Sequence, residues 1–116
     1  MTNQLEDRRL DRVRTYYRAL DDHEYDRLEA ILTEGFVHER PDRTITGRES
    51  FVTFMREGRP AKDTSHPLTA VYRELDGEEY VARGRLLDSD GNEITAFVDV
   101  FSFSDDRISH ILTFTN

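Results

Sequence analysis

Glu93-Ile-Thr-Ala-Phe-Val-Asp-Val-Phe-Ser-Phe103 is the most strand-like stretch of the chain, because β-branched and aromatic residues fill it. One carboxylate, Asp99, interrupts the apolar run. Such a group must either face water or lie in an interior that accommodates a charge or a proton. We therefore predict that Asp99 faces an internal chamber, and that the rest of the chain builds this chamber around it.

The composition predicts one globular domain, residues 1–116, with a single core. The chain has no cysteine, which excludes disulfides and thiolate metal sites. No apolar run approaches the roughly 20 residues of a membrane helix. Residues 1–9 lack the apolar core of a secretory signal, so we expect a cytoplasmic protein that contacts no membrane.

The charge balance is acidic. The net charge is −8, from 24 acidic and 16 basic residues, and Lys62 is the only lysine. An acidic surface argues against DNA or RNA as a partner. The preference for arginine over lysine is typical both of salt-adapted archaea and of GC-rich bacteria, and the composition does not separate these sources.

Hydrophobic periodicity and turn signals predict an α+β fold, with helices on one face of an antiparallel sheet. Asp21 and Glu24 have the spacing of a capping box, as do Thr46 and Glu49, and Gly35 is a natural helix stop. In chain order, the predicted elements are helices over 4–20 and 22–35, a strand over 36–41, a helix over 47–58, and strands over 68–75, 80–88, 94–103 and 107–114.

The turn at residues 90–91 sets the register of one hairpin. A two-residue turn, Asp-Gly, pairs Ala82 with Asp99 and Gly84 with Phe97. Because small residues then lie opposite large ones, we expect a hollow beside Asp99.

Strand alternation gives the stretch 94–103 two apolar faces. The face that carries Asp99 should meet the helices. No helix remains to cover the other face, so we expect a homodimer through it. The residues expected at this interface are Val98, Val100, His110, Leu112 and Phe114.

The chain resembles the nuclear transport factor 2-like superfamily, which includes SnoaL-like polyketide cyclases and ketosteroid isomerases. The resemblance covers nearly the whole chain and rests on the order and spacing of three stretches. These are Tyr16-Tyr-Arg-Ala-Leu-Asp-Asp22, Gly47-Arg-Glu-Ser-Phe51, and Val98-Asp-Val-Phe-Ser-Phe103 leading to Arg107-Ile108. It implies a cone-shaped α+β barrel (a cystatin-like roll), in which three N-terminal helices pack on a curved, mainly antiparallel sheet around a small cavity.

The resemblance also places individual residues. Tyr16 and Asp99 stand where ketosteroid isomerases hold a developing enolate with a tyrosine and a protonated aspartic acid. Arg40 stands where those enzymes have their carboxylate base, and arginine cannot abstract a proton because it stays charged. Met55 replaces a further tyrosine. Steroid isomerisation by that mechanism is therefore disfavoured.

His38 and Arg40 alternate on a short strand and share one face. If this face points inward, a cationic pair lies opposite Asp99, and His38 could act as a general base near neutral pH. The alternative, with Val37 and Glu39 inward, would bury a glutamate, so we favour an inward His38.

Asp99 has two interpretations, a cavity acid or base and a buried ion-pair partner of Arg40. Desolvation would raise the pKa of Asp99, whereas pairing with Arg40 would lower it. His66 precedes Pro67 at the start of the sheet. Its side chain is expected either at the cavity rim or, as we favour, in solvent.

The predicted catalytic residues are Asp99, His38 and Tyr16, and the predicted substrate contacts are Arg40, Tyr17, Phe51, Phe54, Met55, His66, Leu86, Phe97, Phe101, Ile111 and Thr113. The histidines have no ligand-like spacing, so we expect no metal, and we expect no cofactor. Three hypotheses remain, because this fold hosts all of them. One is an enzyme that performs acid–base isomerisation, cyclisation, dehydration or hydration on a small apolar substrate. The others are a non-catalytic protein that binds a hydrophobic ligand and a dimeric scaffold with a filled interior.

Overall fold

The computed structural model describes residues 4–116, so residues 1–3 of the predicted domain lie outside the described part. The helices are α1 (Gln4–Asp21), α2 (Tyr25–Ala30) and α3 (Arg48–Thr53), which continues as the π-helical segment η1 (Phe54–Gly58). The strands are β1 (Leu32–Glu39), β2 (Thr44–Thr46), β3 (Leu68–Arg73), β4 (Tyr80–Leu87), β5 (Glu93–Ser104) and β6 (Arg107–Thr115).

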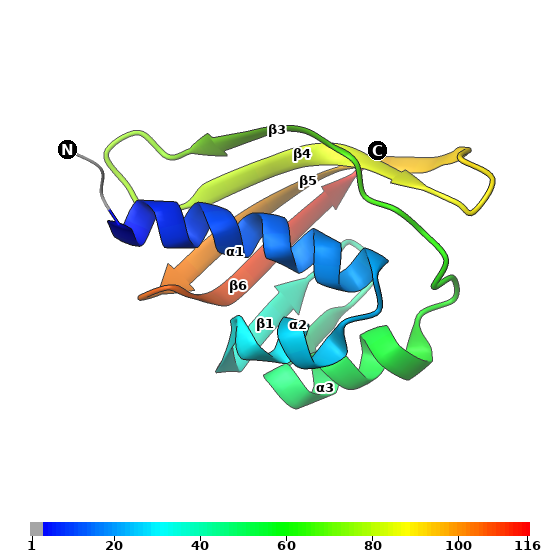
Figure 1. The fold of residues 1–116 in the computed structure, drawn as a ribbon, viewed down its shortest axis with the longest axis horizontal. Helices are drawn as coiled ribbons and strands as arrows, with labels where there is room; N and C mark the ends of the chain where they lie inside the picture. Colours follow the sequence, from blue (N-terminus) through cyan, green and yellow to red (C-terminus); the bar gives the residue numbers. More distant parts are fainter. Residues whose placement is uncertain (1–3) are drawn as a thin grey trace.

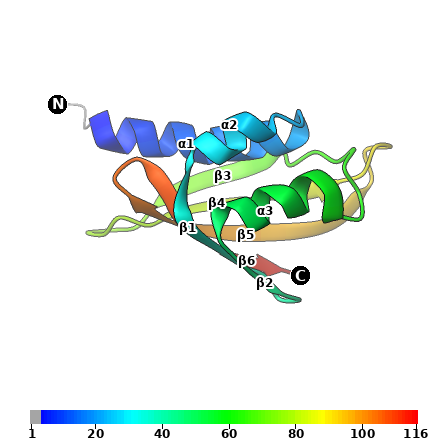
Figure 2. The ribbon, with the colours of Figure 1, turned by 90° about the horizontal axis from the view of Figure 1, so that it is seen from below.

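The strands form one six-stranded sheet in the order β2-β1-β6-β5-β4-β3. The β1–β6 pair is parallel and the other pairs are antiparallel. The sheet curls without closing, and the helices lie on one side of it, with α1 crossing β4 and β6 (Figures 1 and 2). This is the predicted mixed α+β architecture. None of the helices within residues 4–116 is long and apolar enough to span a membrane.

The β4–β5 hairpin has the predicted register, with Ala82 opposite Asp99 and Gly84 opposite Phe97. Alternation along β5 buries Phe97, Asp99 and Phe101 beneath the helices. Phe101 is fully buried and packs with the aromatic rings of α1, so the core lies between α1 and the inner face of the sheet.

The second helix is shorter than predicted. It ends at Ala30, and β1 begins at Leu32, so Gly35 lies within a strand instead of ending a helix. The backbone N–H of Ile108 in β6 donates to the carbonyl of Ile31 at 2.8 Å, and Leu32 is fully buried. Pairing with β6 and burial of Leu32 therefore override the helical spacing of this segment.

Neither predicted capping box forms. The residues at the helix starts are Glu24 for α2 and Gly47 for α3, and neither helix has a side-chain cap. The carboxylate of Asp21 instead accepts hydrogen bonds from His66. Thr46 pairs with Val37 as part of β2, a short strand that was not among the predicted elements.

Gly84 is where the inner face of the sheet tolerates no side chain. A Cβ atom there would lie 2.5 Å from the carbonyl oxygen of Pro67 and 3.0 Å from Cζ of Phe97. We predict that Gly84→Ala lowers the free energy of unfolding by about 2 kcal/mol, because overpacking forces backbone shifts. Urea denaturation measures the loss. Gly35→Ala is the matched control, since its Cβ meets nothing within 4 Å and should cost little. Equal losses in both variants would contradict the prediction.

Candidate functional site

A cavity of about 540 Å³ lies between the curled sheet, the C-terminal half of α1 and the segment that follows α3. The sheet contributes His38, Leu86, Phe97, Asp99 and Thr113, α1 contributes Tyr16, Tyr17 and Leu20, and the segment after α3 contributes Met55, Arg59, Thr64 and His66. The cavity thus has an apolar wall and a cluster of polar groups on its inner surface.

Asp99 is the centre of this polar cluster, with only 5% of its surface exposed. Its Oδ2 accepts a hydrogen bond from the Tyr17 hydroxyl at 2.5 Å, and its Oδ1 accepts one from the Thr113 hydroxyl at 2.5 Å. The Nε2 of His38 lies 2.8 Å from the same Thr113 oxygen. Thr113 is available because the β5–β6 register sets it directly opposite Asp99. Four side chains from α1, β5, β6 and β1 therefore form one hydrogen-bonded chain.

Burial raises the pKa of Asp99, and it outweighs the hydrogen bonds from Thr113 and Tyr17, which favour the carboxylate. Arg40 is not the ion-pair partner of Asp99. Its Nε lies 3.2 Å from Oδ1 of Asp42 instead. The ion-pair interpretation of Asp99 is therefore wrong, and the cavity holds a carboxyl group that is drawn toward its neutral form.

His38 points inward, as predicted, and is 5% exposed. Burial, followed by the charge of Arg40, lowers the pKa of His38 to about 3. The prediction that His38 acts as a general base near neutral pH is therefore wrong. With so low a pKa, the neutral imidazole accepts a proton poorly. Its Nδ1 is buried without a partner among residues 4–116. We assign the ring proton to Nε2, which then donates to Thr113.

Tyr17, not Tyr16, contacts Asp99. Successive helical residues point about 100° apart, so only one of two adjacent tyrosines can reach a given atom. Tyr16 makes no side-chain hydrogen bond to any of the described residues, and its ring packs edge-on against Phe101 while it lines the cavity. Burial raises the pKa of both phenols, which keeps both hydroxyls protonated.

His66 lies at the cavity and not in solvent, which corrects the position that we favoured. Its Nδ1 lies 2.5 Å from Oδ1 of Asp21, and its backbone N–H donates to Oδ2 of Asp21 at 3.0 Å. Because Asp21 accepts the Nδ1 proton, Nε2 carries the lone pair of the neutral ring. His66 and Asp21 form a dyad of the kind that orients a histidine base.

The structure separates the other predicted contacts into two groups. The side chains that line the cavity are Arg40, Tyr17, Met55, Leu86, Phe97 and Thr113. The side chains that do not are Phe51, Phe54, Phe101 and Ile111. Phe51, Phe101 and Ile111 are fully buried in the core, and Phe54 packs under the guanidinium of Arg43 at 4.7 Å. The spacing and hydrophobicity of residues along the sequence do not distinguish a cavity wall from a core.

Several lining residues were not predicted from the sequence, and two of them, Asp42 and Arg59, are charged. Arg59 follows the helix stop at Gly58, and nothing in its position predicts which way its side chain turns. Ile94 was also missed. A β-bulge opposite Leu87 alters the alternation of β5 there and brings Ile94 to the cavity mouth.

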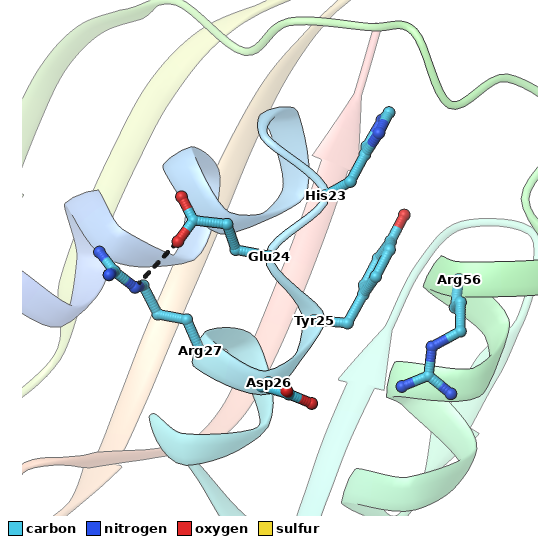
Figure 3. A pocket seen from close by; sticks show the side chains of 6 residues that line it. All are labelled: His23, Glu24, Tyr25, Asp26, Arg27 and Arg56. Carbon is cyan, nitrogen blue, oxygen red and sulfur yellow. Dashed lines mark ion pairs between the residues drawn. The ribbon is translucent and has the colours of Figure 1, made fainter.

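A second hollow, of about 550 Å³, lies on the surface between α2 and η1 (Figure 3). Its lining consists of His23, Glu24, Tyr25, Asp26, Arg27 and Arg56. These are mainly exposed charged groups, and Glu24 and Arg27 neutralise each other at 3.1 Å. The buried polar chemistry is therefore in the Asp99 cavity. Within residues 4–116, no group of three or more histidine, aspartate or glutamate side chains is arranged to hold a metal ion.

A family model described as a SnoaL-like domain matches residues 13–111. Comparison with curated proteins gives no match. Solved structures of other proteins share the fold, among them these three. A candidate ketosteroid isomerase from Kribbella flavida is 23% identical, with 96% of this chain and 78% of that chain covered and a TM-score of 0.81. A candidate SnoaL-like polyketide cyclase from Jannaschia sp. is 17% identical, with 100% and 90% covered and a TM-score of 0.80. An NTF2-like protein of unknown function from Burkholderia xenovorans is 15% identical, with 98% and 87% covered and a TM-score of 0.81.

The raised pKa of Asp99 gives folding a pH dependence of definite sign. The carboxyl group ionises near 3.8 in the unfolded chain and at higher pH in the folded protein. As the pH rises through this window, the unfolded state loses its proton first, so the stability that the protonated group contributes is lost. We predict that Asp99→Asn gains stability relative to the wild type as the pH rises from about 4 to about 8. The gain should be about 1.4 kcal/mol for each pH unit that separates the folded and unfolded pKa values. Urea unfolding at several pH values measures this difference, and a difference that stays flat or falls would mean that Asp99 is ionised throughout.

Proposed function

The chain belongs to the SnoaL-like domain family, and we propose that it binds a small, largely apolar molecule in the Asp99 cavity and performs acid–base chemistry on it. The observation that carries the proposal is that a desolvated carboxyl group, Asp99, and a histidine held by a carboxylate, His66, line the same cavity. Two titratable groups in different environments are typical of an acid and a base that work together. Solved neighbours that are candidate isomerases and cyclases agree with this chemistry.

In this proposal Asp99 is the acid. It gives its proton to a substrate oxygen and becomes a carboxylate, which the hydroxyls of Tyr17 and Thr113 stabilise by donating to its two oxygens. When the carboxylate takes the proton back, the same oxygens remain bonded. His38 is a positioning residue, because it contacts Thr113 and not the substrate-facing carboxyl.

His66 is the proposed base. Asp21 holds its Nδ1, so the Nε2 lone pair is available to a carbon acid in the cavity. Abstraction of a proton next to a carbonyl by His66, with protonation of the carbonyl oxygen by Asp99, gives a neutral enol. Such a step serves isomerisation, cyclisation and dehydration alike, and Arg40 need not act as a base.

The cavity suits a small molecule with an apolar body. Phe97, Leu86 and Met55 supply the apolar wall, and about 540 Å³ lies within the usual range for ligand sites. The hydroxyl of Tyr16 is a further hydrogen-bond donor for a carbonyl group.

The proposal predicts enolisation of a simple ketone. In D₂O, the wild type should bind 2-tetralone and speed the exchange of its α-hydrogens, followed by NMR. Asp99→Asn and His66→Gln should each slow the exchange by about 100-fold, because general acid–base catalysis contributes at least this much, while binding is kept. Asp90→Asn, in an exposed turn, is the matched control and should exchange at the wild-type rate.

Binding without exchange would identify a ligand-binding protein, and no binding would favour a scaffold. Native mass spectrometry of the purified protein would show a retained ligand.

We also propose that two copies pair through the convex face of the sheet. Within residues 4–116 the helices lie on the opposite side (Figure 2). Tyr72, Val81, Val100 and Leu112 pair in register across β3, β4, β5 and β6 and form an apolar row on this face. Phe114, opposite Val98, is 53% exposed. A second copy of the same face, related by a two-fold axis, would cover the row.

The dimer proposal has a direct test. Val98→Glu sets a charge in the middle of the apolar face, so we expect monomers, or insoluble protein, by sedimentation velocity. Thr53→Glu adds the same charge to the exposed side of α3 and should leave the wild-type sedimentation unchanged. A Val98→Glu protein that sediments as the wild type does would rule out this interface.

A further inference from the structure

We propose that the molecule in the cavity carries a carboxylate, and that Arg59 binds it. This inference rests on the proposed function, because it names the class of substrate that the acid and base would act on. It is carried by the surroundings of Arg59, which differ from those of the other charged groups at the cavity.

Arg59 follows η1 directly and lines the cavity. Its Nη2 donates to the carbonyl oxygen of Leu20 at 3.1 Å and to the hydroxyl of Tyr25 at 3.1 Å. Both acceptors are uncharged, so they fix the guanidinium in place without neutralising it. No carboxylate of residues 4–116 lies within the 4.0 Å of an ion pair with Arg59.

The Nε of Arg59 is buried and has no acceptor among the described residues. A buried N–H without a partner is costly, and native proteins keep few of them. The Nη1 group also keeps its donors free of acceptors within residues 4–116. Because Nε is enclosed, a ligand would be met by the free donors of Nη1 and by the positive charge of the group at the edge of the cavity, which is what a carboxylate requires.

The other ionisable groups of the lining do not compete for this role. Arg40, which the sequence predicted among the substrate contacts, already has a carboxylate partner: it lies 3.2 Å from Asp42, which also pairs with Arg43. His38 is neutral, and His66 is paired with Asp21. Asp99 is drawn toward its neutral form. Among the cations of the described lining, Arg59 is therefore the one without a carboxylate partner.

This charge acts inside the cavity and not only at its rim. Burial, followed by the charge of Asp99, raises the pKa of the Tyr16 hydroxyl, and the charges of Arg40 and Arg59 oppose this rise. The positive charge of Arg59, next to the larger effect of Arg40, therefore reaches a phenol that lines the cavity. Because the protein has a net charge of −8, the cavity is a local attraction for anions on a molecule that otherwise repels them.

The arrangement also gives the ligand an orientation. Its carboxylate would lie at Arg59, and its apolar body would lie along Phe97, Leu86 and Met55, toward Asp99 and His66. A small apolar carboxylic acid with a carbonyl or hydroxyl group farther along the chain fits this pattern.

Two probes of the same shape test the inference, 2-naphthoate and its neutral counterpart 2-naphthamide. Calorimetric titrations of the wild type at pH 7 and low salt should give about 10-fold tighter binding of the carboxylate or more. Arg59→Gln should weaken the binding of 2-naphthoate by about 10- to 100-fold and change the affinity for 2-naphthamide by no more than about 2-fold. Arg56→Gln removes an arginine of the same segment that lies outside the cavity lining, so both affinities should stay as in the wild type.

Two further measurements keep the test valid if Arg59→Gln folds poorly. Arg59→Lys keeps the charge and should keep part of the preference for the carboxylate. In the wild type, added salt should weaken the binding of 2-naphthoate and leave the binding of 2-naphthamide unchanged, because salt screens only the charged pair. Equal affinities for both probes in the wild type, or a preference that survives in Arg59→Gln, would overturn the inference. If 2-tetralone exchange is intact in that case, the proposed acid–base function stands. Loss of both probe binding and exchange would remove both proposals.

Discussion

Asp99 is buried in the middle of β5, and each of its carboxyl oxygens meets a hydroxyl at 2.5 Å. A buried carboxyl group without such partners would cost several kcal/mol. One hydroxyl, that of Tyr17, comes from α1, and the other, that of Thr113, comes from β6. The position of α1 across the sheet and the β5–β6 register must therefore both be correct before this group can be buried. His38 extends the same requirement to β1, because it contacts Thr113.

The cavity beside Asp99 follows from the sizes of the side chains on two neighbouring strands. Ala82 and Gly84 on β4 lie opposite Asp99 and Phe97 on β5. The small residues leave space on the inner face, and the absence of a side chain at Gly84 also lets the carbonyl of Pro67 approach closely. The same residues thus hollow the inner face and bring the segment that precedes β3 close to it. A side chain at Gly84 could not be accommodated by a side-chain rotation alone, because the close contact is with the backbone carbonyl of Pro67.

Local rules predicted the register of β5 and failed where distant parts of the chain meet. The structure confirms the predicted pairing of Asp99, but the turn is longer than the predicted two residues. The N–H of Asp88 donates to the carbonyl of Asn92, and an irregularity between Leu86 and Leu87 restores the register. The choice between Tyr16 and Tyr17 depends on the rotation of α1 about its axis, which hydrophobic spacing does not fix because both residues are buried. The pairing of Asp21 with His66 joins residues 45 positions apart. A local capping pattern gave no sign that Asp21 had a partner in the loop before β3.

Arg40 acquires a different meaning once its neighbours are known. The resemblance to ketosteroid isomerases would put a carboxylate at this position, and a second carboxylate beside Asp99 would push the pKa of Asp99 further upward. Burial raises the pKa of Asp99, but the hydrogen bonds and the charges of His66 and Arg40 all oppose the rise. An arginine at this position therefore holds the pKa of Asp99 lower than a carboxylate there would. A group held permanently neutral can only donate a hydrogen bond, whereas a group near its pKa can also exchange its proton. In this chain the arginine at position 40 removes a base there and, together with Thr113, Tyr17 and His66, opposes the rise in the pKa of Asp99, which in the proposed function favours release of the Asp99 proton.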